Sequence, residues 1–375
     1  MIYFDNAATT GHKPTQVINA VDNALKNLSA NPGRSGHKLS QNAAFKVYET
    51  RDKTAEFFNC DGAEKVVFTQ NCTASINYVL KGVLNSNDHI IVSDLEHNAV
   101  MRPLKSMNIS YTIAEVSLED DSQTVKNFLN AVNKNTKMIF CTAASNVLGK
   151  MPPLEKIGAL CKKHGLLFGV DAAQGAGVFN IDMEKMNIDY LCVAPHKGFY
   201  APMGLGVLIA KGPIKRTLIE GGTGTDSFSF LQPDTLPEML ESGTVNLPAI
   251  AGLSAGIDFV NSRKNNIFEY ENMLVKKLYK GLSQNSDIVL YTNPSNGGYA
   301  PVLSFNIKDI PSEKTAAYLS ERGFALRAGL HCAPVAHQKI GTTKTGTVRF
   351  SPSVFNTDKE VDLLLKNVNF FKKYY

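Results

Sequence analysis

Short runs of apolar and β-branched residues alternate with amphipathic stretches between about residue 65 and residue 210. The runs predict strands at Lys65–Thr69, His89–Ser93, Ser110–Val116, Met138–Thr142, Leu166–Val170 and Tyr190–Val193. The stretches between them have helical patterns. Such alternation predicts βαβ units, in which a mostly parallel sheet carries helices on both faces.

One of these helices is marked at both ends. Pro152–Pro153 begins it, an apolar stripe runs from Leu154 to Cys161, basic residues fill its last turn, and Gly165 ends it. The run Leu166–Val170 follows at once, as a central strand of the sheet would.

The pattern changes after about residue 250. The sequence there predicts a long helix, two strands, another helix and a final helix behind a capping box. These elements lie at Glu269–Leu282, Ile288–Thr292, Val302–Ile307, around Ser312–Arg322 and after Thr357–Glu360. We therefore expect an α/β protein with a large domain over residues 15–250. A smaller α+β C-terminal domain would comprise residues 251–375 together with the N-terminal segment 1–14.

Composition and charge narrow the class of protein. The 375 residues are 43% hydrophobic and 19% charged, which is typical of a globular enzyme. No window of 18 apolar residues and no signal-peptide pattern is present, so we expect no membrane span, no secretion and a cytoplasmic location. The net charge of +5 is spread without a basic run, which disfavours binding of nucleic acid.

The six cysteines indicate free thiols in a reducing compartment. They occur at positions 60, 72, 141, 161, 192 and 332, and none belongs to a Cys-x-x-Cys pair. This spacing predicts neither a disulfide framework nor a metal site.

A lysine follows the strand predicted at Tyr190–Val193, in the run Ala194-Pro-His-Lys. Ligands of α/β sheets bind at the carboxyl ends of the strands. A partly desolvated Lys197 in that place can form a Schiff base. A lysine on a surface loop fits the same four residues, so this run alone does not decide between the two interpretations.

An aspartate emerges from the apolar strand before it, and Gln174 follows three residues later. A carboxylate such as that of Asp171 is costly to bury without a cationic partner. The pyridinium nitrogen of pyridoxal phosphate (PLP) is such a partner, and Gln174 could then reach the ring hydroxyl. The alternative is an aspartate that caps a helix.

Two further runs carry candidate chemistry. Hydroxyl and amide side chains gather in Thr69–Ser75, between a strand and a helix, where an anion such as phosphate can bind; N-capping would explain the same residues. In Arg327–Cys332 a cysteine stands beside a histidine and near an arginine, which favours a reactive thiol over a small packing residue. The other five cysteines lie mostly in apolar runs and are interpreted as packing residues.

Together these residues resemble the class V aminotransferase-fold enzymes, and more narrowly the cysteine desulfurases and selenocysteine lyases of the second group, which have a short cysteine loop. The resemblance extends from Phe4 to Asp358. It is carried by Asp5–Thr10, Glu96-His97, Ser145-Asn146, Asp171 with Gln174, His196-Lys197, Ser242–Thr244 and Arg327 with His331-Cys332. It implies PLP-dependent transferase fold type I.

The resemblance implies a PLP site in which Lys197 holds the cofactor covalently. The other members would be Asp171 at the pyridinium nitrogen, Gln174 at the ring oxygen, His97 on the ring face, and Cys72, Thr73 and His196 around the phosphate. Thr244 would reach the phosphate of the neighbouring subunit, which implies a homodimer. Lys197, His97 and Cys332 would be the catalytic residues.

The implied substrate is L-cysteine or L-selenocysteine. Asn146 and Arg349 would hold its carboxylate, for which the bidentate fork of arginine is suited. The remaining members of the substrate site would be Arg327, Arg34, His37 and Ala8. Two positions depart from the family: Ala194 stands where a serine is usual, and Gly33 stands where the second group often has histidine.

The implied reaction removes sulfur or selenium and leaves alanine. Lys197 would take the α-proton, and with cysteine the Cys332 thiolate would attack the substrate sulfur and become a persulfide for an acceptor protein. Selenium leaves more easily and would need less help from Cys332. Another class V aminotransferase or lyase, or an inactive scaffold, is the alternative. No Gly-x-Gly-x-x-Gly follows the first strand, which argues against an NAD site.

Overall fold

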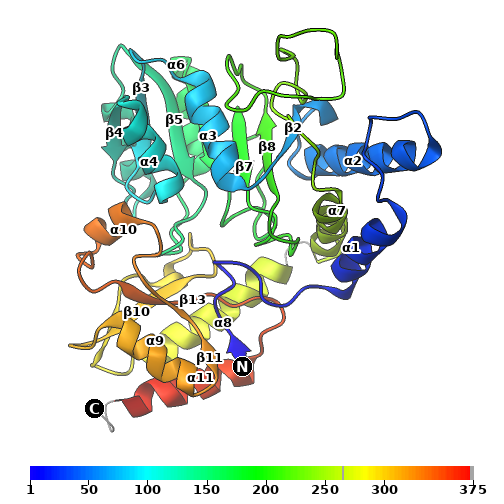
Figure 1. The fold of residues 1–375 in the computed structure, drawn as a ribbon. Coiled ribbons are helices and arrows are strands. Elements are labelled where there is room, and N and C mark those ends of the chain that lie inside the picture. The colour runs from blue at the N-terminus through cyan, green and yellow to red at the C-terminus, as the bar shows by residue number, and fades with distance from the viewer. Residues whose placement is uncertain (264–265, 372–375) are drawn as a thin grey trace.

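The computed structural model describes residues 1–263 and 266–371. Its largest sheet has seven strands in the order β2-β8-β7-β6-β5-β3-β4 (Figure 1). They are β2 (Val66–Thr69), β3 (His89–Ser93), β4 (Ser110–Ala114), β5 (Thr136–Thr142), β6 (Leu167–Asp171), β7 (Tyr190–Val193) and β8 (Gly206–Ala210). All the strands predicted before residue 200 are present: two have the predicted ends, and the ends of the other four differ by at most two residues.

Strand direction in this sheet is mostly parallel. The neighbouring pairs among β7, β6, β5, β3 and β4 are parallel, whereas β8 runs antiparallel to both β7 and β2. The predicted α/β class with a mostly parallel sheet is therefore confirmed. The sequence analysis did not predict strand β8.

Helices cover both faces of the large sheet because side chains alternate along each strand. In β5, Met138 and Phe140 share a core with α3 and α4, whereas Ile139 and Cys141 share one with α2, α6 and α7. The helices of this part are α1 (Thr15–Asn27), α2 (Lys38–Phe57), α3 (Cys72–Val83), α4 (Asn98–Met107), α5 (Asp121–Asn130), α6 (Leu154–His164) and α7 (Leu247–Asn261), with a 3-10 turn at Ala63–Lys65. Helix α6 ends at a left-handed Gly165, as predicted.

A second sheet of order β12-β13-β10-β9 is antiparallel throughout. Its strands are β9 (Ile288–Leu290), β10 (Leu303–Ile307), β12 (Arg327–Gly329) and β13 (Thr347–Phe350). Around it lie α8 (Asn266–Leu282), α9 (Ser312–Glu321), α10 (Pro334–Lys339) and α11 (Asp358–Phe370), with a 3-10 turn at Pro294–Asn296. Thr357 and Glu360 form the predicted capping box of α11.

The N-terminal residues join this second part. Strand β1 (Ile2–Tyr3) pairs in parallel with β11 (Phe324–Ala325), and Asp5 forms a bridge to Ser351. In Figure 1 the blue N-terminal strand accordingly lies among the orange and red elements. The chain then crosses to the large sheet, so its first residues pass between the two sheets.

The division into two domains at residue 250 stays a prediction. Residue 250 lies inside α7, and α7 packs against α1 and α2 beside the large sheet. Within residues 1–263 and 266–371, none of the helices combines the length and the apolar character needed to cross a membrane.

Candidate active site

The carboxyl ends of two neighbouring parallel strands bring a lysine and an aspartate to one cavity. Asp171 is the last residue of β6, and Lys197 lies on the turn that follows β7. Both line a cavity of about 120 Å³. Its wall also includes Asn71, Cys72, Thr73, His97, Asn146, Gln174 and His196. The structure thus assembles in one place most of the residues that the sequence predicts for the cofactor site.

The amine of Lys197 is buried in the wall of this cavity. Burial lowers the pKa of Lys197, and the nearby negative charge of Asp171 opposes that shift. A desolvated amine with a lowered pKa loses its proton more readily and can then form a Schiff base or accept a proton from carbon.

Asp171 is held in one orientation by two donors on the same oxygen. The side chain is 4% exposed. Its Oδ1 accepts a hydrogen bond from the Ala173 N–H at 2.9 Å and from the Cys72 thiol at 3.7 Å. A buried carboxylate stabilises a cation beside it, and the negative charge of Asp171 acts on Lys197 in the same cavity.

The start of α3 offers backbone donors to an anion. Asn71 caps this helix, because its side chain accepts from the Ala74 N–H at 2.9 Å. The exposed Thr73 adds a hydroxyl at the same end. Free amides and the helix dipole together favour an anion there. Binding of a phosphate at this end of α3 stays a prediction.

His196 faces the cavity as a neutral ring. Burial, followed by the charges of Lys197 and Lys13, lowers the pKa of His196 to about 4. Its Nδ1 lies 3.0 Å from the Thr9 hydroxyl. The buried Ala194 supplies no hydroxyl in this region, which is the departure noted in the sequence.

His97 forms another wall of the cavity at the start of α4. Its Nδ1 accepts from the Ala99 N–H at 3.0 Å and so caps the helix. This bond places the ring proton on Nε2. Burial lowers the pKa of His97, although Asp171 opposes the shift, so the ring is a neutral, flat surface suited to stacking.

Arg349, predicted to hold a substrate carboxylate, is buried and contacts Asn146 of the cavity wall. Arg349, on β13, is 1% exposed. Its Nη2 donates to Asp5 Oδ1 at 2.6 Å and its Nη1 to the Asn146 carbonyl at 3.1 Å, but its Nε has no partner. A donor left over on a buried guanidinium fits a site that receives an anion. Sequence reasoning missed Asp5, although it opens the quoted Asp5–Thr10 run.

Cys332 lies exposed on the turn between β12 and α10. Its carbonyl accepts from the Asn98 N–H at 2.7 Å, and the His331 carbonyl accepts from Asn146 Nδ2 at 2.8 Å. These bonds attach the cysteine turn to two parts of the cavity wall. His331 and Cys332 both have left-handed backbone angles, with φ of 48° and 57°, which mark a sharp and specified turn.

Arg327 and His331, which the sequence places near Cys332, lie in different environments. Arg327 Nη2 lies 3.7 Å from the cysteine sulfur. His331 is buried, and its Nε2 lies 3.0 Å from the Thr347 carbonyl. Burial lowers the pKa of His331 to about 2, so this side chain belongs to the core rather than to the thiol.

Six predicted substrate or phosphate residues do not line the Lys197 cavity: Arg327 and Arg349, described above, and Arg34, His37, Thr244 and Ala8. Arg34 Nη2 donates to the carbonyls of Gly222 and Gly243, and Thr244 accepts from Asn31. His37 caps α2. Ala8 lies on the loop beside Ala7, whose carbonyl accepts from Gln174 Nε2 at 2.9 Å. Their roles stay predictions.

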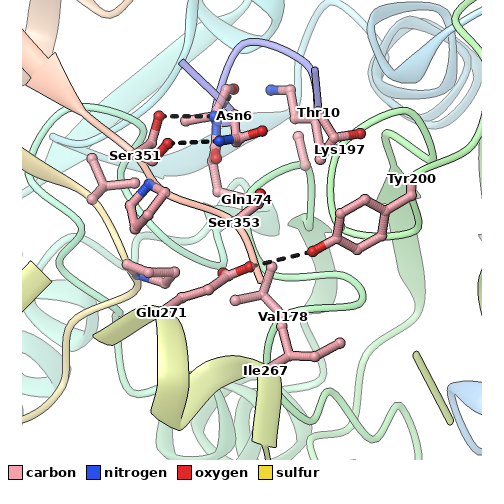
Figure 2. Close-up of a pocket in the computed structure, with 16 residues that line it drawn as sticks. Asn6, Thr10, Gln174, Val178, Lys197, Tyr200, Ile267, Glu271, Ser351 and Ser353 are labelled. Carbon is pink, nitrogen blue, oxygen red and sulfur yellow. Dashed lines mark hydrogen bonds between the residues drawn. The ribbon is translucent and has the colours of Figure 1, made fainter. Parts of the chain in front are cut away.

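A second, smaller cavity of about 40 Å³ is also lined by Lys197 and Gln174 (Figure 2). Glu271 of α8 points toward Tyr200 there, and the Tyr200 hydroxyl donates to its carboxyl at 3.3 Å. Burial raises the pKa of Glu271 to about 8. Sequence reasoning missed this group, although a glutamate in the apolar stripe of α8, between Ile267 and Leu274, was the available signal.

The comparisons with known proteins agree over the whole chain. The model of the family described as aminotransferase class-V matches residues 2–364. A protein of Pyrococcus abyssi, named a probable cysteine desulfurase, is 32% identical over 97% of this chain and 92% of its own length. One of Borreliella burgdorferi with the same name is 31% identical over 96% of this chain and 89% of its own.

Solved structures agree with these sequences. The apo structure of cysteine desulfurase from Thermococcus onnurineus has a TM-score of 0.89 and 31% identity, and covers 100% of this chain and 95% of its own. The fold expected from the sequence, PLP-dependent transferase fold type I, is confirmed. Among the described residues, no cluster of His, Cys, Asp and Glu could hold a metal ion.

Proposed function

Because this chain belongs to the aminotransferase class-V family, we propose that it is a PLP-dependent enzyme that removes sulfur from L-cysteine and leaves L-alanine. The observation that carries the proposal is the placement of Cys332. An exposed thiol beside Arg327 is attached, through the Asn98 N–H, to the wall of the cavity that contains Lys197. A transaminase has no use for a thiol in that place.

The residues of the cavity fit PLP. Lys197 supplies an amine of lowered pKa, Asp171 supplies a buried carboxylate, and the capped start of α3 supplies donors for a phosphate. When bound, PLP supplies an electron sink for the electron pair left on the substrate α-carbon. Lys197, Asp171, Gln174, His97, Cys72, Thr73 and His196 would hold it.

The protein groups would act in a definite order. Arg349 and Asn146 hold the substrate carboxylate, and the amine of Lys197 removes the α-proton. The Cys332 thiolate then attacks the substrate sulfur, so that an S–S bond forms while the bond from sulfur to the β-carbon breaks. The electron pair of that broken bond stays with the β-carbon, which takes up a proton. The α-carbon also regains a proton, and the product leaves as alanine. Cys332 retains the sulfur as a persulfide.

L-Selenocysteine is the second proposed substrate. Alanine forms only if the electron pair of the broken C–Se bond stays on the β-carbon, so selenium must leave as neutral selenium and not as selenide. The C–Se bond is weaker than the C–S bond, so this release would need less help from Cys332, which would serve mainly to donate a proton to the β-carbon. The exposed position of Cys332 suits both roles.

We also propose a cytoplasmic homodimer that passes its persulfide sulfur to an acceptor protein. The segment between β8 and α7 contains no helix or strand and exposes Phe228, Phe230 and Leu231 almost fully. Apolar side chains this exposed are typical of a surface that a partner covers. Thr244, on the same segment, does not reach the cavity of its own chain, which supports a role in the site of a second subunit.

The experiment compares alanine release by wild type, Cys332→Ala and Cys60→Ala on L-cysteine and L-selenocysteine at matched concentrations. We expect Cys332→Ala to lose cysteine turnover by several orders of magnitude, since an essential nucleophile carries that much of the rate. Mass spectrometry should find a persulfide on Cys332 of the wild type. Cys60 is a buried packing residue, so its variant is the matched control. Unchanged cysteine turnover in Cys332→Ala would remove the thiol from the reaction and favour another class V activity.

A further inference from the structure

Cys72 differs from the other cysteines in its surroundings. Cys60, Cys141, Cys161 and Cys192 are buried in the cores, and Cys332 is exposed on its turn. Cys72 is the first residue of α3 and lines the same cavity as Lys197 and Asp171. The proposed function places Cys72 among the residues that would hold PLP but assigns its thiol no particular contact.

The thiol of Cys72 donates a hydrogen bond to Asp171. Its sulfur lies 3.7 Å from Asp171 Oδ1, and an ionised carboxylate can only accept. Burial, and then the negative charge of Asp171, raise the pKa of Cys72 well above its usual value. The group therefore stays a neutral donor and is not a second nucleophile.

The hydrogen bond from Cys72 helps to fix the orientation of the Asp171 carboxyl group. Oδ1 also accepts from the Ala173 N–H, and no described residue donates a hydrogen bond to Oδ2. Two donors on one oxygen restrict rotation of the carboxyl group about its last bond. Because Cys72 begins α3, the same bond links the aspartate to the end of the helix that offers donors to a phosphate.

We propose that Cys72 is a positioning residue that orients Asp171 by its thiol hydrogen bond and leaves Oδ2 for the ring nitrogen of PLP. The inference rests on the proposed function only for the identity of the cofactor. Cys72 acts through Asp171 and takes no part in sulfur transfer.

The proposal predicts a spectroscopic effect in the absence of substrate. If Asp171 is oriented less well, the ring nitrogen holds its proton less firmly. The Schiff base at Lys197 then keeps its own proton to higher pH, since a neighbouring positive charge no longer disfavours it. In Cys72→Ala we expect the pH midpoint of the visible band to rise by about half a unit and PLP to bind about three- to tenfold more weakly, the effect of one ordinary hydrogen bond, because a thiol is a weak donor.

Two other variants make the test specific. Cys72→Ser keeps a donor of similar size, so it should restore the midpoint and the PLP affinity to within about twofold of wild type. Cys60→Ala removes a buried thiol far from the cavity and should change neither quantity. A merely structural role for Cys72 would not give a shift in the midpoint that serine reverses.

The measurements are a spectrophotometric pH titration of each holoenzyme and reconstitution of each apoenzyme with PLP, both without substrate. If Cys72→Ala and Cys72→Ser match wild type and Cys60→Ala in both quantities, the proposal is overturned. The proposed sulfur chemistry is tested by a separate experiment, the detection of a persulfide on Cys332. A wild type that binds PLP at Lys197 but forms no Cys332 persulfide would contradict the proposed function and leave the result on Cys72 in force.

Discussion

The guanidinium of Arg327 lies 3.7 Å from the sulfur of Cys332, whereas the ring of His331, next to that cysteine in sequence, is buried in the core. The left-handed backbone of His331 and Cys332 turns the two side chains to different environments. Of these two neighbours, Arg327 is therefore the one whose side chain contacts the sulfur of Cys332.

Replacing Arg327 by glutamine should slow the reactions of Cys332. A positive charge about 4 Å from a thiolate is worth on the order of 1 kcal/mol where water screens it, so we expect a three- to tenfold loss. The measurement is the rate of iodoacetamide labelling of the Cys332 peptide at neutral pH, followed by mass spectrometry. Arg322→Gln is the control, because Arg322 stacks on Tyr318 instead. Equal labelling rates in wild type and Arg327→Gln would contradict the assignment.

Asp5 should prove essential to the buried Arg349. Removing one partner of a buried ion pair leaves an uncompensated charge, which costs about 3–5 kcal/mol when both groups are inaccessible. Asp5 keeps 21% of its side-chain exposure, so we expect Asp5→Asn to lower the free energy of unfolding by about 2 kcal/mol. Urea denaturation measures this. In the exposed pair of Asp22 with Lys26, Asp22→Asn should change stability by less than about 0.5 kcal/mol.

Local patterns predicted much of the fold. Apolar runs located the strands of the large sheet up to β7, and proline, basic residues and glycine located α6. Strand β8, Gly206–Ala210, is an apolar run of the same kind, but its antiparallel place between β7 and β2 depends on contacts with residues more than a hundred positions away. Nothing in a local window specifies such a pairing.

The sequence predicted the placement of those candidate site residues that lie close together in one short run and directly follow a strand. His196-Lys197 and Asp171 with Gln174 follow strands directly, so their place at the carboxyl edge of the sheet follows from topology. The orientation of His331 and the pairing of Arg349 with Asp5 depend on turns and on strand contacts that bring distant residues together. Residue types alone do not carry that information.

The role proposed for Thr244 can be tested by mixing two inactive or weakened proteins. If Thr244 serves the partner's phosphate, a mixed dimer of Lys197→Ala with Thr244→Val contains one fully native site, and Lys197→Ala alone contains none. We expect the mixture, at limiting PLP, to turn over cysteine faster than the sum of its two components. If Thr244 serves its own chain, no native site can form and the activities only add.

The exposed apolar segment should hold the dimer together. Phe230→Ser removes a large side chain that is exposed in the single chain, so we expect the dissociation constant of the dimer to rise at least about tenfold. Light scattering across a dilution series measures it. Leu363→Ser, on the exposed face of α11, is the control and should leave association unchanged. A wild type that is monomeric and fully active would contradict the proposed assembly.

Glu271 should make the stability of the protein fall as pH rises. Its pKa is about 8 in the fold, because burial disfavours the charge, and 4.5 in an exposed reference state. Below pH 4.5 Glu271 holds its proton in both the folded and the unfolded state, so it does not make the free energy of unfolding depend on pH. Between pH 4.5 and 8 the folded state keeps a proton that the unfolded state loses, so stability decreases by up to about 1.4 kcal/mol per pH unit. Above pH 8 the loss is complete.

Glu271→Gln should remove this slope while keeping an acceptor for the Tyr200 hydroxyl. We expect the variant to match wild type within about 1 kcal/mol near pH 4.5 and to exceed it by about 2–4 kcal/mol at pH 8.5, since some hydration of the small cavity softens the full linkage effect. Denaturation at both pH values measures the difference. Glu96, whose pKa burial also raises to about 8, is present in both proteins and cancels. Glu269→Gln, exposed on the same helix, is the control; a difference between wild type and Glu271→Gln that does not change with pH would show that Glu271 is already charged in the fold.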